Sequence, residues 1–184
     1  MIDTRITFRK VFGHLKTILV HKRWVFCYAC KLGIPWRGIK HDMSKFSPVE
    51  FWESVRYWDG KSSPIPRCKA DKGYSLAWQH HKGRNSHHYE YWIDYLDQGG
   101  IPIKMPWKDL LELIADYLGA GRAYLGKEFT YQKELAWWER KRFDERPKIH
   151  KDTAYMISAM LFCFAATERV GDLGFWKLKY EHLS

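Results

Sequence analysis

The chain has 184 residues, of which 46% are hydrophobic and 28% are charged, and no Pro-, Gly- or Ser-rich linker divides it. We therefore expect one globular domain over residues 1–184. The longest apolar run, residues 155–166, stops at about twelve residues, short of the roughly 18 that a membrane span requires. Together with an N-terminus that lacks a signal-peptide pattern, this predicts a cytoplasmic protein without a membrane partner.

The formal net charge of +10, from 31 Lys and Arg against 21 Asp and Glu, favours anionic partners. Phosphorylated small molecules, nucleotides and nucleic acids all satisfy this condition, and charge alone does not choose between them.

The N-terminal segment predicts a long amphipathic helix. Apolar residues recur at three- and four-residue steps over residues 7–32, and Gly33 then ends the pattern. His21 lies three residues after Ile18 and four before Val25, so it shares their apolar stripe. We expect its imidazole to face the interior.

The middle of the chain predicts three further helices. Ser47 and Glu50 form a capping box before a helix at residues 51–58. A loop with glycine and prolines then precedes a predicted helix over about 70–82, and a short break leads to another over about 87–96.

The last part of the chain predicts helices over residues 106–124, 130–142 and 152–169, the third apolar around most of its circumference and so expected to be central to the core. No alternating strand or hairpin pattern is apparent. The fold class predicted is all-α, with six to eight helices. The candidate site residues lie in about residues 7–124, and helices in 125–184 are expected to serve packing, a lid or an interface.

Histidine and aspartate recur along the chain in a pattern suited to metal binding. Imidazole nitrogen and carboxylate oxygen together favour a transition-metal ion. Adjacent helical residues project about 100° apart, so His41 and Asp42 can both serve a site only near a helix end or between two ions. On the helix at 106–124, Asp116 is expected to point inward, with Asp109 and Glu112 as alternatives. The residues that make up this pattern are His21, His41, Asp42, His80, His81, His87, His88, Glu90 and Asp116.

The order of an early His, a His-Asp pair, further histidines and a late Asp resembles the H…HD…D pattern of the HD-domain metal-dependent phosphohydrolase superfamily. The HDxSKF segment at 41–46 and the NxHHxEYW segment at 85–92 are similar to an uncharacterised family of small bacterial and phage proteins, a likeness that covers about residues 17–120. The resemblance implies an HD-like fold and places one ion on His21, His41, Asp42 and Asp116. For a second ion it implies His81 with one or both of His87 and His88, and the choice among these and His80 stays open.

The same resemblance implies hydrolysis of a nucleotide or related phosphoester, with one or two ions of Mn, Fe, Co, Ni or Zn activating water. Asp42 would bridge the ions or orient the nucleophile, and Lys45 would contact a phosphate oxygen. Supporting or substrate-binding roles are expected for Asn85, Glu90, Arg84 and Glu112.

Two other functions remain open from the sequence. One keeps the fold and both ions but uses iron for oxygen chemistry, as some HD-like oxygenases do. The other is a basic helical module that binds nucleic acid or an acidic protein without catalysis, in which case the histidines are structural.

Overall fold

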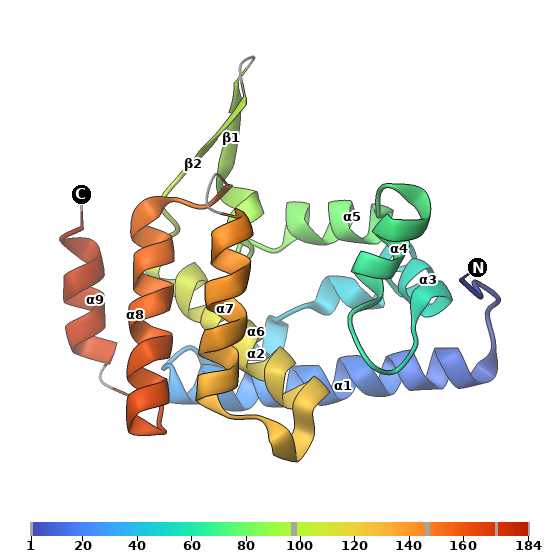
Figure 1. Cartoon of the computed structure of the whole chain (residues 1–184), viewed down its shortest axis with the longest axis horizontal. Coiled ribbons are helices and arrows are strands. Elements are labelled where there is room, and N and C mark those ends of the chain that lie inside the picture. Colours follow the sequence, from blue (N-terminus) through green and yellow to red (C-terminus); the bar gives the residue numbers. More distant parts are fainter. Residues whose placement is uncertain (1, 97–98, 146–147, 172, 184) are drawn as a thin grey trace.

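The computed structural model describes residues 2–96, 99–145, 148–171 and 173–183, and within them the protein is almost entirely helical (Figure 1). This part of the chain contains nine α-helices, one more than the expected upper limit, and the all-α prediction is confirmed. The helices are α1 (Phe8–Lys31), α2 (Pro35–Lys40), α3 (Pro48–Tyr57), α4 (Pro64–Lys72), α5 (Leu76–Arg84), α6 (Trp107–Leu125), α7 (Tyr131–Glu145), α8 (Lys151–Thr167) and α9 (Leu173–Glu181). Short 3-10 helices η1 (Met43–Phe46), η2 (Tyr89–Trp92) and η3 (Gly126–Glu128) and strands β1 (Ile93–Leu96) and β2 (Gly99–Pro102) complete the description.

The strongest local signals in the sequence are confirmed. The N-cap side chain of Thr7 accepts from the Lys10 amide at the start of α1, and that of Ser47 accepts from the Glu50 amide at the start of α3. Each cap satisfies an amide that would otherwise lack a partner in the first helical turn.

Two predicted helices in the middle of the chain are wrong. The helix expected over 70–82 is divided between α4 and α5, because Gly73 ends α4 in the left-handed region at φ 81° and Ser75 caps a new helix. The helix expected over 87–96 is replaced by η2 and by β1, which pairs with β2 in an antiparallel hairpin that projects from the helical body (Figure 1).

Helix α6 forms the centre of the molecule. Its residues Asp109 to Gly119 are all buried, a longer continuous buried stretch than in α8, which the sequence predicted to be central. Helices α1 and α6 approach closely at Gly119, where an added Cβ would lie 2.9 Å from the Val25 amide nitrogen. The absence of a side chain at Gly119 thus sets the separation between the two helices that carry His21 and Asp116.

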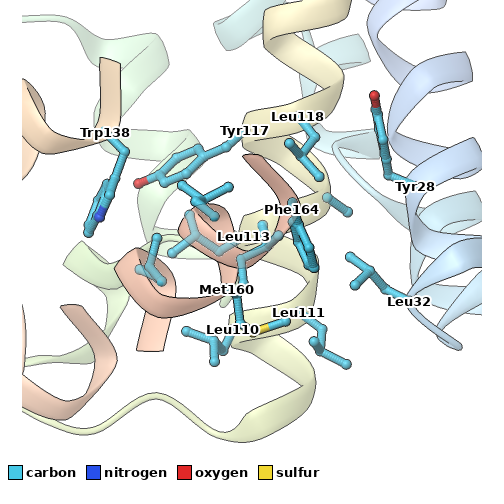
Figure 2. Close-up of a cluster of buried hydrophobic side chains, with 14 of the residues drawn as sticks. Tyr28, Leu32, Leu110, Leu111, Leu113, Tyr117, Leu118, Trp138, Met160 and Phe164 are labelled. Atoms are coloured by element: carbon cyan, nitrogen blue, oxygen red, sulfur yellow. The ribbon is translucent and has the colours of Figure 1, made fainter. Parts of the chain in front are cut away.

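The hydrophobic core joins α1, α6, α7 and α8 (Figure 2). Met160 and Phe164 of α8 pack against α6, and Trp138 of α7 is fully buried. A fully buried side chain of this size contributes about 1.5–3 kcal/mol relative to exposure. The packing role expected for the C-terminal helices is therefore present. None of the described helices is long and apolar enough to cross a membrane.

Candidate metal centre

The seven predicted ligand residues come together at one buried place between α1, α5 and α6. His21 lies on α1, His81 on α5 and Asp116 on α6, whereas the other four lie in the segments that follow α2 and α5. Each is at most 9% exposed: His21, His41, Asp42, His81, His87, His88 and Asp116.

The His41-Asp42 pair occupies a turn between α2 and η1. Two adjacent residues were expected to serve one site only near a helix end or between two ions, and this turn lies at a helix end. His41 is the C-cap of α2, and Asp42 adopts the left-handed conformation at φ 53° and ψ 28°. Asp tolerates this region better than most residues with a side chain. The Lys22 ammonium donates to the carbonyl oxygens of Ile39 and His41, which holds the turn against α1.

One oxygen of Asp42 faces a first group of ligands. Asp42 Oδ2 lies 3.4 Å from His21 Nε2 and 3.1 Å from His41 Nε2. Asp116 Oδ1 lies 3.1 Å and 3.4 Å from the same two nitrogens. These four residues each offer an atom within 4.8 Å of the others, so they could hold one metal ion.

The other oxygen of Asp42 faces a second group. Asp42 Oδ1 lies 3.2 Å from His81 Nε2 and 3.4 Å from His87 Nε2, and His88 completes a cluster that meets the same 4.8 Å limit. Asp42 is therefore common to two groups of possible ligands, one on each carboxylate oxygen.

Glu112 supports one imidazole from each group. Its Oε1 accepts from His41 Nδ1 at 3.0 Å and lies 3.2 Å from His87 Nδ1, the nitrogens on the far side of each ring from Asp42. The Arg37 Nε donates to Glu112 Oε2 at 2.6 Å. Although His41, His87 and Glu112 also lie close enough to hold an ion, the Arg37 cation favours a supporting role for Glu112.

Glu50 supports His81 in the same way. Its Oε2 accepts from His81 Nδ1 at 2.7 Å, and its Oε1 accepts from His80 Nδ1 at 2.6 Å. Asn85 caps α5 by donating from Nδ2 to the His81 carbonyl at 2.7 Å, and its Nδ2 also lies 3.2 Å from His81 Nδ1. The sequence identified Glu50 only as a helix-capping residue. Its contact with His81 joins two different helices across 31 positions of sequence, so local patterns could not reveal it.

Opposite charges stabilise the ionised carboxylates of the centre. Burial alone would raise the pKa of Asp42, but the charges of His41 and Lys45 hold it well below its usual value. Burial opposes ionisation of Asp116 too, and its bonds to His21 and His41 lower that pKa. Both carboxylates are thus ready to accept a cation at neutral pH.

The histidines of the centre fall into two sets, one with raised pKa values and one with lowered pKa values. Burial would lower the pKa of His81, but Asp42 raises it to about 9, and Asp42 also raises the pKa of His41. Burial lowers the pKa of His87 and His88, so both are neutral ligands at physiological pH. A metal ion would replace the protons on His41 and His81, so binding would release protons.

The buried polar atoms of the centre fit a metal ion. Within the described structure, the Nε2 atoms of His21, His41, His87 and His88 and both Asp42 oxygens are buried and make no well-formed hydrogen bond, although most of them lie within ion-pair distance of another group of the centre. Buried polar atoms without partners are costly, and so many in one place indicate a ligand that satisfies them all. The donor set of imidazole and carboxylate suits Mn, Fe, Co, Ni or Zn.

Lys45, predicted to contact a phosphate oxygen, forms an ion pair with Asp42. Its Nζ is 2.5 Å from Asp42 Oδ2, and its side chain is 31% exposed. Burial would lower the pKa of Lys45, but Asp42 and Asp116 raise it, so it is charged.

Three other predicted residues lie outside the ligand clusters. Glu90 belongs to none of the candidate metal groups found among the described residues. Asp109 pairs with Arg37 instead of facing the histidines, so the acidic residue of α6 that faces His21 and His41 is Asp116. Arg84 ends α5 and lines a separate surface cleft.

A cavity of about 240 Å³ opens over the ligand clusters. Its lining includes His21, His81, His88, Asp116 and Lys45. The sequence did not identify the contribution of α7, which adds side chains from outside the predicted site region. The other walls include His14, Ile65, Trp78, Tyr117, Tyr124, Trp137 and Lys141.

Comparison with known proteins gives one match. A family model described as a family of unknown function, DUF5662, matches residues 10–162. The chain belongs to this family. The family region includes all seven ligand residues, α7 and most of α8. Searches of curated proteins and of solved structures found no match, so the resemblance to HD-domain proteins stays a prediction.

Proposed function

We propose that this DUF5662 member is a metal-dependent phosphohydrolase that acts on a nucleotide or related phosphoester. The observation that carries the proposal is the placement of Asp42, whose two oxygens face separate groups of ligands. His21, His41, Asp42 and Asp116 would hold one ion, Asp42 with His81, His87 and His88 would hold a second, and a pair of ions would supply stabilisation of the attacking and leaving oxygens in phosphoryl transfer.

Bound ions would supply activation of water near neutral pH and screening of the phosphoryl charge. In the net reaction, water adds to phosphorus, the ester P–O bond breaks, and the leaving alcohol gains a proton. Lys45 is placed to bind a non-bridging phosphoryl oxygen, because its charged Nζ lies beside Asp42 and its side chain lines the cavity.

The surrounding residues would hold the ligands in one orientation. Glu112 and Glu50 each accept from the Nδ1 side of an imidazole, which directs Nε2 of His41, His87 and His81 toward Asp42. Fixed ligands reduce the reorganisation needed during the reaction.

The residues that line the cavity also indicate the kind of substrate that would fit. Its lining includes Trp78 and Trp137, whose rings offer stacking surfaces for a nucleobase. Lys141, whose Nζ lies 5.3 Å from the Trp137 ring centroid, adds a second cation at this wall. These features favour a phosphoester with an aromatic group over inorganic polyphosphate.

One observation favours oxygen chemistry at iron as the second candidate. Five of the seven ligand residues are histidines, and imidazole-rich sites suit iron as well as zinc. This function predicts oxygen consumption by the iron-loaded protein, whereas the first predicts phosphate release that needs no oxygen.

The test is phosphate release from a panel of nucleoside phosphates by protein loaded without oxygen with Mn²⁺, Fe²⁺, Co²⁺, Ni²⁺ or Zn²⁺. We expect hydrolysis with at least one ion, and its loss in Asp42→Asn. Asp94→Asn, an exposed carboxylate on the hairpin, is the matched control and should retain activity. Metal uptake without hydrolysis of any substrate in the panel would contradict the proposal.

A further inference from the structure

A second cleft, of about 360 Å³, lies beside the metal centre and shares no lining residue with the cavity over the ligands. It lies against the supporting side of the centre, because it reaches Glu112 and His87, which face each other through Glu112 Oε1 and His87 Nδ1. Its lining residues are Trp36, Arg37, Lys40, Arg84, Asn85, Ser86, His87 and Glu112.

Three cationic side chains surround this cleft. The guanidinium of Arg37 is held in place by Glu112 and Asp109, so little conformational entropy remains to be lost on binding. Lys40 and Arg84 are exposed, and within the described structure no ion pair joins either of them to a carboxylate. Lys40 and Arg84, which have no such acidic partner, favour an anionic ligand, and arginine in particular favours phosphate.

An aromatic ring lies next to these cations. Trp36 on α2 is 75% exposed, although it is among the largest apolar side chains in the protein. An exposed indole at the edge of a basic cleft provides a stacking surface for a planar ring. A ligand that carries both phosphate groups and a planar ring would satisfy the cations and the indole, and a nucleotide has both.

We propose that this cleft is a nucleotide-binding site, with the phosphates on Arg37, Lys40 and Arg84 and the base stacked on Trp36. The volume of about 360 Å³ is in the usual range for a small-molecule site. The site takes a nucleotide as a ligand and not as a substrate, because four candidate metal ligands, His21, His81, His88 and Asp116, line the other cavity and only His87 lines this cleft. It is independent of the proposed hydrolysis.

The test is calorimetric titration of adenosine diphosphate into the full chain in the presence of excess EDTA, so that metal binding plays no part. We expect Lys40→Glu/Arg84→Glu to weaken binding at least tenfold and Trp36→Ala at least fivefold. Lys127→Glu is the matched control, since Lys127 is exposed and lies beyond the opposite end of α6 from Glu112. It should change the affinity less than twofold.

Several results would overturn the proposal. One is no binding at millimolar adenosine diphosphate, and another is binding that neither cleft variant weakens. Inorganic phosphate that binds as tightly as adenosine diphosphate would show an anion site without base recognition. A short single-stranded oligonucleotide that binds a hundredfold more tightly, with a steep salt dependence, would assign the cleft to nucleic acid instead.

Discussion

Replacement of Glu112 by glutamine tests the supporting structure of the metal centre. Glu112 Oε1 contacts an imidazole from each ligand group, His41 Nδ1 at 3.0 Å and His87 Nδ1 at 3.2 Å. Loss of such a supporting contact typically lowers metal affinity by about 10–100-fold. Because one residue supports both groups, we expect a loss of this size at each ion, about 1.4–2.8 kcal/mol per ion.

The assay is competition for Zn²⁺ or Mn²⁺ with a chromophoric chelator, after circular dichroism has shown that the variant is folded. Asp109→Asn is the matched control, because Asp109 is buried and bonds the same Arg37 but contacts no imidazole of the centre. It should change the affinity less than about threefold. Equal affinities in Glu112→Gln and Asp109→Asn would refute the role assigned to Glu112.

Three further predictions address catalysis, packing and pH. Lys45→Met should lower phosphate release about 100-fold with ion content unchanged, and parallel loss of ions would contradict a phosphate-binding role. Gly119→Ala should destabilise the protein by about 1–3 kcal/mol in urea and weaken metal binding, because its Cβ would lie 2.5 Å from Val25 Cγ2 and 2.9 Å from the Val25 amide nitrogen. Burial and the charge of Asp116 raise the pKa of Glu134 from 4.5 to about 8. In EDTA, stability should therefore fall as pH rises between these values, and Glu134→Gln should remove that fall and be more stable by about 2–4 kcal/mol near pH 8. Equal urea midpoints for wild type and Glu134→Gln near pH 8 would contradict this assignment.

Helices α1, α3 and α6, which carry part of the site, could be predicted because their signals are local. The apolar spacing that places His21 inward, and the capping box at Ser47, depend on residues within one or two turns. Helical geometry alone also predicts that His41 and Asp42 can both serve a site only near a helix end or between two ions, and in the structure they lie at the end of α2. These predictions are confirmed.

The rest depended on contacts between distant residues. The sequence predicted a helix over about 87–96, whereas residues 93–96 form a strand that pairs with residues 99–102. Strand pairing depends on partners across a turn, which helix propensity and periodicity do not reveal. Nor could sequence identify Glu50 as a partner of His81, or place α7 over the cavity, because both require the tertiary packing of separate helices.

The most direct test of the central claim is the ion content of the protein, measured by elemental mass spectrometry after incubation with each metal and removal of excess. A centre bridged by Asp42 predicts two ions per chain in the wild type and less than one in Asp42→Ala, with Asp94→Ala equal to wild type. No uptake by the wild type, or the same uptake in Asp42→Ala, would contradict the account.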